Sequence, residues 1–238
     1  MIFEKNVRVE FCDINVKNQV LNRGLLRLMQ EVASYHSDSV GYGINDVAST
    51  NMSWVLINQR MKVFSRPCWG TDLKVKTWSR GSKGAFCLRD FEVYDSKGEL
   101  VCTASSSWTI VNAKTGSIIK PSHEIIDVYG TEDKSVFNDS SQRLREPDNS
   151  RKTFEYKIQK RDIDINNHVN NLFYLDFAEE ALPLKVCEKL FNCVEIYYKK
   201  ATKLEDSIIC FYADVDDEYV VTIKSTETGH VHALIKLS

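Results

Sequence analysis

Residues 162–171 read DIDINNHVNN and residues 13–22 read DINVKNQVLN, so two related decapeptides occur 149 positions apart. Five of the ten positions are identical: Asp13/Asp162, Ile14/Ile163, Asn18/Asn167, Val20/Val169 and Asn22/Asn171. A repeat at a fixed separation indicates that one structural unit occurs twice. We therefore predict that the chain consists of two halves with the same fold.

Each decapeptide stands between a strand-like segment and a helical segment. Apolar residues alternate before it, at Val7, Val9 and Phe11 in the first copy and at Phe154, Tyr156 and Ile158 in the second. Apolar residues at helical spacing follow it, at Leu25, Leu28, Met29 and Val32 and at Leu172, Leu175, Ala178 and Leu182. Further strand-like runs follow at 73–77, 86–94 and 101–111, and at 194–198, 207–215, 219–224 and 230–237. We expect an α+β fold in which each half is an antiparallel sheet around one long helix.

A polar stretch separates the two halves. Residues 130–150 read GTEDKSVFNDSSQRLREPDNS, with few apolar residues and with Pro147 near the end. This composition is typical of a linker. The expected organisation is an N-terminal domain at 1–129, a linker at 130–150 and a C-terminal domain at 151–238.

Composition excludes several classes of protein. The 238 residues carry a formal net charge of −2, which is unlike a nucleic-acid-binding protein. The seven cysteines are odd in number and contain no C-x-x-C pair, so neither a disulfide framework nor a zinc finger is expected. No segment approaches the roughly 20 apolar residues that span a bilayer. The first residues do not resemble a signal or transit peptide, and with free cysteines they favour the cytoplasm.

The second decapeptide carries residues suited to hydrolysis. Asp164, Asn166 and His168 are spaced by two, so in extended backbone they project to one side. An imidazole accepts and returns a proton near neutral pH. A carboxylate orients or activates water or attacks the substrate itself, and a carboxamide positions either partner. These three residues are the candidate catalytic set, and the pattern calls for no metal and no cofactor.

The helix that begins after this set adds candidate donors. The first N–H groups of a helix have no partner within the helix, so the backbone at Val169 and Asn170 is a candidate oxyanion site. A structural alternative stays open, because Asp and Asn before a helix are common caps and His168 is equally compatible with a plain surface position. The first copy has Asn15, Lys17 and Gln19 in place of the candidate set, which predicts one site per chain.

Several motifs resemble those of the acyl-acyl-carrier-protein thioesterases. Residues 54–56 (WVL) and 66–71 (RPCWGT) are similar to the family's W-V and P-x-W-G-D segments. Residues 103–108 (TASSSW), with Asn112, Thr115, Lys120 and Pro121, resemble its A-T-S-x-W, N-x-x-T and K-x-P motifs. The second decapeptide resembles its D-L-D-x-N-x-H-V-N-N motif, whose generic form is shared with acyl-CoA hydrolases. Without a plastid transit peptide, the chain resembles a bacterial-type member.

The resemblance implies a tandem (double) hotdog fold and the hydrolysis of fatty acyl thioesters of acyl carrier protein in fatty acid biosynthesis. It also implies that the N-terminal domain shapes the acyl pocket. Two alternatives stay open: an acyl-CoA thioesterase, or a non-catalytic acyl-binding protein with a degenerate site. The expected partners are acyl carrier protein and the acyl thioester, with neither nucleic acid nor a membrane span, and a homodimer is compatible with the sequence.

One position departs from the family pattern. Members carry a Glu after a Y-x-[RK]-E strand pattern, and this chain has Ala201 there, followed by Thr202 where plant members have a cysteine. Either Asp164 and His168 suffice, or another carboxylate substitutes, or activity is low. The candidate substitutes are Glu195, Glu205 and Glu179.

Overall fold

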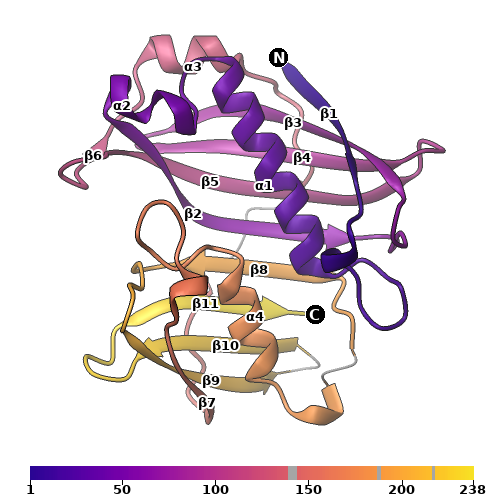
Figure 1. Cartoon of the computed structure of the whole chain (residues 1–238), viewed down its shortest axis with the longest axis vertical. Coiled ribbons are helices and arrows are strands. Elements are labelled where there is room, and N and C mark those ends of the chain that lie inside the picture. Colours follow the sequence, from indigo (N-terminus) through magenta and orange to yellow (C-terminus); the bar gives the residue numbers. More distant parts are fainter. Residues whose placement is uncertain (139–143, 187–188, 216–217) are drawn as a thin grey trace. The chain divides into compact units, whose positions relative to one another are not determined.

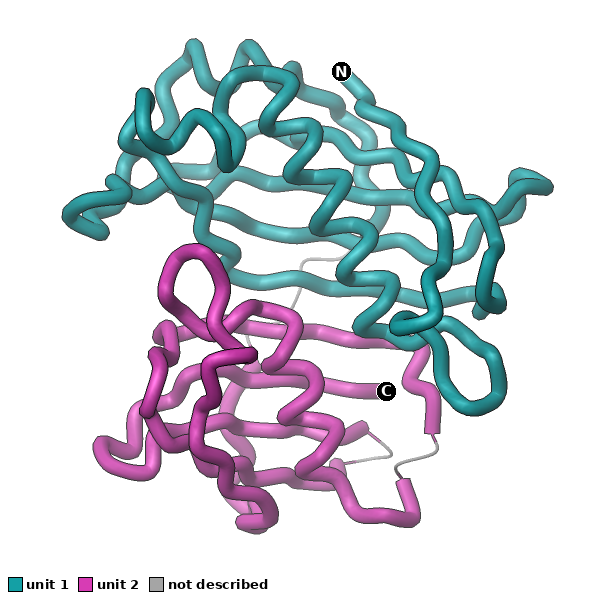
Figure 2. The backbone as a smooth tube through the Cα atoms, viewed as in Figure 1, with its two compact units in different colours: residues 1–140 teal, residues 141–238 magenta. Residues whose placement is uncertain are grey.

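The computed structural model describes residues 1–138, 144–186, 189–215 and 218–238. The chain divides into two compact units, 1–140 and 141–238, shown in different colours in Figure 2. Each unit is an antiparallel sheet with a helix across one face (Figure 1), which confirms the expected α+β hotdog architecture. Among the described residues, no helix combines the length and the apolar character needed to cross a bilayer.

Unit 1 contains the longer strands and the longer helix. Its elements are β1 (Ile2–Arg8), η1 (Phe11–Asp13), α1 (Asn22–Ser39), η2 (Ile44–Asp46), α2 (Val47–Thr50), β2 (Met52–Val63), β3 (Asp72–Lys83), β4 (Phe86–Asp95), β5 (Leu100–Asn112), β6 (Ile118–Ile119) and α3 (His123–Tyr129). The strand order is β1-β3-β4-β5-β2, with β6 on β5. The apolar stripe of α1 at Leu25, Leu28, Met29 and Val32 is buried, so this face of the helix forms the core with the sheet.

Unit 2 repeats this topology with shorter elements. They are β7 (Arg151–Lys157), η3 (Lys160–Asp162), α4 (Phe173–Glu180), η4 (Leu184–Val186), β8 (Cys193–Tyr198), β9 (Ser207–Val215), β10 (Glu218–Ser225) and β11 (Val231–Leu237). The order β7-β9-β10-β11-β8 places the first, third, fourth, fifth and second strands side by side, as in unit 1. Leu175 and Ala178, both on α4, are fully buried.

Three features differ from the sequence expectation. The twelve-residue strand β2 was not among the expected strands, because Asn58, Gln59 and Arg60 interrupt its apolar pattern. Helix α4 has eight residues and ends before Leu182, since Pro183 disfavours helical backbone in the residue before it.

The third difference concerns the expected linker. Its residues 139–143 lie outside the described part of the chain, but the preceding residues are attached to unit 1. Glu132 N–H donates to the Ser79 carbonyl at 3.0 Å, and Trp78 Nε1 donates to the Lys134 carbonyl at 2.9 Å. Val136 N–H donates to the buried Asp90 carboxylate at 3.0 Å. The segment up to residue 138 therefore belongs structurally to unit 1.

Candidate active site in unit 2

The segment between β7 and α4 forms a closed loop. Its base is the Ile163–Val169 bridge, together with the Asn170 N–H bond to the Asp162 carbonyl at 2.8 Å. The Asp162 carboxylate is 1% exposed and accepts the Gln159 N–H at 2.8 Å, which fixes the turn of η3. At the tip, Asn167 has a φ of +59°, a left-handed conformation that asparagine tolerates better than most residues. The loop geometry is thus encoded by its Asp and Asn residues.

Asp164 organises the candidate catalytic set. One of its carboxylate oxygens accepts the Asn166 N–H at 2.8 Å and the His168 N–H at 3.4 Å. Asn166 Nδ2 lies 3.5 Å from the other oxygen, and Asp164 N–H donates to the His168 carbonyl at 2.8 Å. The structure therefore brings the backbone of all three residues together around one carboxylate.

The side chains of this set differ in exposure. Asn166 is exposed, whereas Asp164 and His168 are half-buried. The imidazole of His168 makes no hydrogen bond with any residue in the described ranges. An imidazole without an internal partner is available to a water molecule or to a substrate, as a general base requires.

The candidate oxyanion donors are already engaged. Val169 N–H donates to the Thr202 carbonyl at 2.9 Å, and Asn170 N–H donates to the Asp162 carbonyl at 2.8 Å. Either amide would have to give up this bond before it could hold a developing negative charge. The sequence pattern places these two amides near the start of the helix but does not reveal that the Thr202 and Asp162 carbonyls already accept from them.

The segment that follows β8 contacts both the loop and helix α4 through Thr202. Thr202 is 1% exposed, and its Oγ1 lies 3.0 Å from the Tyr174 hydroxyl, which also accepts the Thr202 N–H at 3.2 Å. Burial raises the pKa of Tyr174. Tyr198 donates to the Asn171 carbonyl at 3.2 Å. Thr202 therefore ties the helix to the strand end, a supporting role that the sequence motif did not reveal.

Neighbouring position 201 is exposed, and the alternative carboxylates occupy different places. Glu205 is exposed, with a φ of +71°, in the turn after Thr202. Glu195 lies on β8 next to Ile196, and strand alternation puts it on the opposite face from this fully buried residue. Glu179 is half-buried near the end of α4. Of the three, Glu205 is closest in sequence to Thr202, whose carbonyl contacts the loop.

Unit 1 contains the same loop with different chemistry. Asn15 Oδ1 accepts the Lys17 N–H at 2.9 Å and the Gln19 N–H at 3.0 Å, as Asp164 does in unit 2. Asn18 has a φ of +56°, and Val20 N–H donates to the Pro67 carbonyl at 2.9 Å. The loop thus folds without a carboxylate at its centre and without a histidine.

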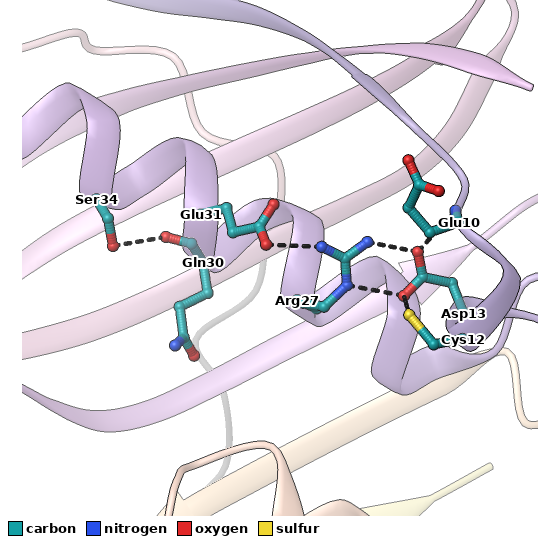
Figure 3. A network of polar contacts seen from close by, with 7 residues as sticks. All are labelled: Glu10, Cys12, Asp13, Arg27, Gln30, Glu31 and Ser34. Carbon is teal, nitrogen blue, oxygen red and sulfur yellow. Dashed lines mark hydrogen bonds and ion pairs between the residues drawn. The ribbon is translucent and has the colours of Figure 1, made fainter. Parts of the chain in front are cut away.

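The start of α1 is held by an ion-pair network (Figure 3). Arg27 donates through Nε to Asp13 at 2.8 Å and through a second nitrogen to the other Asp13 oxygen, and it also contacts Glu31. Asp13 is 1% exposed and also accepts the Glu10 N–H at 3.0 Å. The hydrogen bond with Asp13 raises the pKa of Arg27. Unit 2 has Asp176 at the position of Arg27, so this network is specific to unit 1. It supports the fold of unit 1 and is not part of the candidate catalytic set.

Unit 1 also contains a hollow between α1 and the sheet. It is small, with a volume of about 20 Å³, which is room for about one water molecule. Ten residues of α1, β2, β4 and β5 line it: Leu26, Met29, Gln30, Leu56, Gln59, Phe91, Ala104, Ser105, Ser106 and Trp108. Ligand pockets have similar walls but volumes of about 300–1,000 Å³, so α1 and the sheet would have to move apart before this hollow could admit an acyl chain.

Two family models match almost the whole chain. The acyl-ACP thioesterase N-terminal domain matches residues 1–129, and the acyl-ACP thioesterase C-terminal domain matches residues 145–237. The chain is 23% identical to an oleoyl-acyl carrier protein thioesterase of Coriandrum sativum, over 97% of this chain and 68% of that protein. It is 28% identical to a palmitoyl-acyl carrier protein thioesterase of Gossypium hirsutum, over 79% of this chain and 49% of that protein. The chain thus spans about half to two thirds of the length of these relatives.

Solved structures show the same fold over the full length. An acyl-ACP thioesterase from Bacteroides thetaiotaomicron superposes with a TM-score of 0.88 at 22% identity, covering 99% of this chain and 96% of that one. A 12:0-ACP thioesterase from Umbellularia californica superposes with a TM-score of 0.86 at 18% identity, covering 100% of this chain and 96% of that one. At these identities the comparison establishes the fold.

Proposed function

The chain belongs to the acyl-ACP thioesterase family, and on this premise we propose that it hydrolyses the thioester of fatty acyl-acyl carrier protein and releases the free fatty acid. The proposal needs no metal and no cofactor, because the reaction consumes only water. It places the chemistry in unit 2, at Asp164, Asn166 and His168.

One observation carries the proposal. Asn15 accepts the same two backbone hydrogen bonds in unit 1 that Asp164 accepts in unit 2, so the loop does not need a negative charge to fold. The carboxylate and the imidazole occur together only in the second copy of the repeated decapeptide. A charge that folding does not require is explained by a role in the reaction.

The proposed reaction follows from these groups. His168 accepts a proton from a water molecule, which attacks the thioester carbonyl carbon, and the C–S bond then breaks. The same imidazole returns the proton to the leaving sulfur, so the products are a carboxylic acid and a free thiol. Asp164 orients the water and stabilises the imidazolium, while the exposed carboxamide of Asn166 donates to the carbonyl oxygen. The backbone amides of Val169 and Asn170 also donate to this oxygen only if their hydrogen bonds to the Thr202 and Asp162 carbonyls break first.

Unit 1 is proposed to hold the acyl chain, because it lacks the catalytic set and because the hollow between α1 and its sheet would take an alkyl chain if it widened. Walls that include Leu26, Met29 and Phe91 suit an alkyl chain. A location in the cytoplasm and a homodimeric state stay predictions that rest on the sequence.

The test is an assay of thiol release from acyl-ACP and acyl-CoA substrates with the same acyl group. We expect turnover of acyl-ACP that is lost in His168→Ala. Turnover of acyl-CoA alone would favour the acyl-CoA hydrolase. Acyl binding without turnover of either substrate would favour the non-catalytic acyl-binding protein, for which the absence of a Glu at position 201 is the specific argument.

A further inference from the structure

The loop of the candidate site and the segment after β8 form one end of unit 2 (Figure 1). They are joined by the Val169–Thr202 bond at 2.9 Å and by the Ile158 N–H bond to the Asp206 carbonyl at 3.0 Å. Five exposed cationic residues lie on these two segments: Lys160, Arg161, Lys199, Lys200 and Lys203. We call these five residues the basic rim.

Unit 1 shows that the fold does not require the basic rim. Its two segments are joined in the same way, by Val20 N–H to the Pro67 carbonyl and by Val9 N–H to the Thr71 carbonyl. The correspondence extends to the left-handed residue, which is Gly70 in unit 1 and Glu205 in unit 2. Positions can therefore be paired one by one between the two units.

The five paired positions in unit 1 are uncharged: Phe11, Cys12, Phe64, Ser65 and Cys68. The same segments of unit 1 carry two other cations, Lys17 and Arg66, so cations are more numerous at the end that carries the candidate site, in a chain whose formal net charge is −2. Such a local positive region attracts an acidic partner and sets its orientation.

Acidic residues on the same segments offset the cations only in part. Asp162 is buried and lies 3.8 Å from Arg161 Nε, and Asp206 accepts the Lys203 N–H at 2.8 Å. Glu205 is exposed, and Asp164 belongs to the candidate catalytic set. Five exposed cations therefore face outward against few exposed carboxylates.

Two exposed apolar side chains lie among the cations. Ile165, at the loop tip, is 72% exposed, and Leu204, beside Lys203, is 42% exposed. Unit 1 has exposed apolar side chains at the equivalent positions, Val16 and Trp69, so the cations are what distinguish this end of unit 2. Charged residues around a few apolar contacts suit a transient protein–protein interface. Coenzyme A would also use cations, for its phosphates, and apolar contacts, for its adenine ring, so the two carriers have to be compared directly.

We propose that the basic rim, with Ile165 and Leu204, is the docking surface for the acidic carrier protein that presents the acyl thioester to His168. This inference rests on the proposed function and adds the partner surface to it. Because the rim adjoins the loop, a docked carrier would deliver the thioester at the end of its phosphopantetheine arm.

The test compares two substrates with the same acyl group, acyl-ACP and acyl-pantetheine, in the whole 238-residue chain. The Lys199→Glu/Lys200→Glu variant should lose at least tenfold in kcat/KM for acyl-ACP, mainly through KM, measured relative to its own kcat/KM for acyl-pantetheine. The charge-conserving Lys199→Arg/Lys200→Arg variant should retain most of the kcat/KM for acyl-ACP. Lys83→Glu, an exposed residue at the end of β3 in unit 1, is the matched control and should change neither ratio.

A second measurement needs no variant. Rising salt should lower kcat/KM of the unmodified chain for acyl-ACP but not for acyl-pantetheine, because salt screens exposed charges. Equal losses on both substrates, or a larger loss on acyl-CoA than on acyl-ACP, would overturn the docking surface while leaving hydrolysis in place. A chain that cleaves none of the three thioesters would overturn the proposed function itself.

Discussion

Asp164 and Asn15 hold equivalent positions in the two units, and each accepts two backbone N–H groups through one side-chain oxygen. The relationship separates the structural role of this position from its chemical role. A carboxamide is sufficient for the structure of the loop. What differs between the two units is the charge.

Asp164→Asn is therefore expected to keep the fold and to lose activity. The new carboxamide can accept the same N–H groups, so the melting temperature should stay within a few degrees of the original. Turnover of acyl-ACP should fall by about 10²-fold or more, since the variant no longer stabilises an imidazolium. Steady-state kinetics and thermal melts check both parts, and the reciprocal Asn15→Asp variant should leave turnover unchanged.

His168→Ala is expected to remove most hydrolysis from a folded protein. General acid–base assistance contributes about 10²–10⁴-fold, and the imidazole makes no hydrogen bond with a described residue that the fold would lose. The matched control is Gln19→Ala, at the equivalent position of unit 1. Turnover near that of the unmodified chain in His168→Ala, with unchanged melting, would remove His168 from the site.

His36 should make the stability of unit 1 dependent on pH. This residue is fully buried. Its burial and, to a smaller extent, the positive charge of the neighbouring Arg89 guanidinium lower its pKa from 6.5 to about 3. Between these two values the unfolded chain binds the proton and the folded chain does not. Stability is therefore complete above pH 6.5 and is lost as the pH falls from 6.5 towards 3, by up to about 1.4 kcal/mol per pH unit.

The measurement is the free energy of unfolding between pH 7 and pH 4. His36→Gln keeps an acceptor for Arg89 Nη1, which lies 3.0 Å from His36 Nδ1, but it does not titrate. Its stability should fall less steeply with falling pH than that of the original chain. Asp90 acts in the opposite direction, because burial raises its pKa, but it is present in both proteins. Parallel curves would contradict the assignment, and the exposed His123→Gln is the control.

The sequence predicts the parts of this structure that are repeated and local. The alternating and helical patterns locate most strands and both main helices, and the identity between residues 13–22 and 162–171 corresponds to two loops with the same hydrogen bonds. Strand β2 lacks a clean apolar alternation, because much of it is only half-buried, so its pattern does not identify it.

Contacts between distant segments could not be predicted. The acceptor for Val169 N–H is the carbonyl of Thr202, and no local pattern connects these two residues. For the same reason the sequence shows only that Thr202 follows Ala201, the position of the missing carboxylate. It does not show that Thr202 contacts Tyr174. The basic rim likewise arises from two segments that meet only in the folded unit.

The last prediction concerns Ala201, which pairs with Arg66 of unit 1. Arg66 donates to the Val20 carbonyl and to Asn22 Oδ1, both at 2.9 Å. Val20 and Asn22 correspond to Val169 and Asn171, so a long side chain at position 201 is expected to reach the start of the helix segment directly after His168.

Ala201→Glu should therefore place a carboxylate beside the candidate site and change turnover at least several-fold. The rate rises if the carboxylate activates water, and it falls if the new charge lies unpaired in partly desolvated surroundings, where its pKa is raised. Preference for acyl chain length should stay the same, because the proposed acyl pocket lies in unit 1. Ala201→Gln has the same size without the charge, so comparing the pH–rate profiles of the two variants isolates the carboxylate. If Glu and Gln both leave the rate and the pH profile unchanged, position 201 does not face the site, and Glu205 becomes the carboxylate to test next.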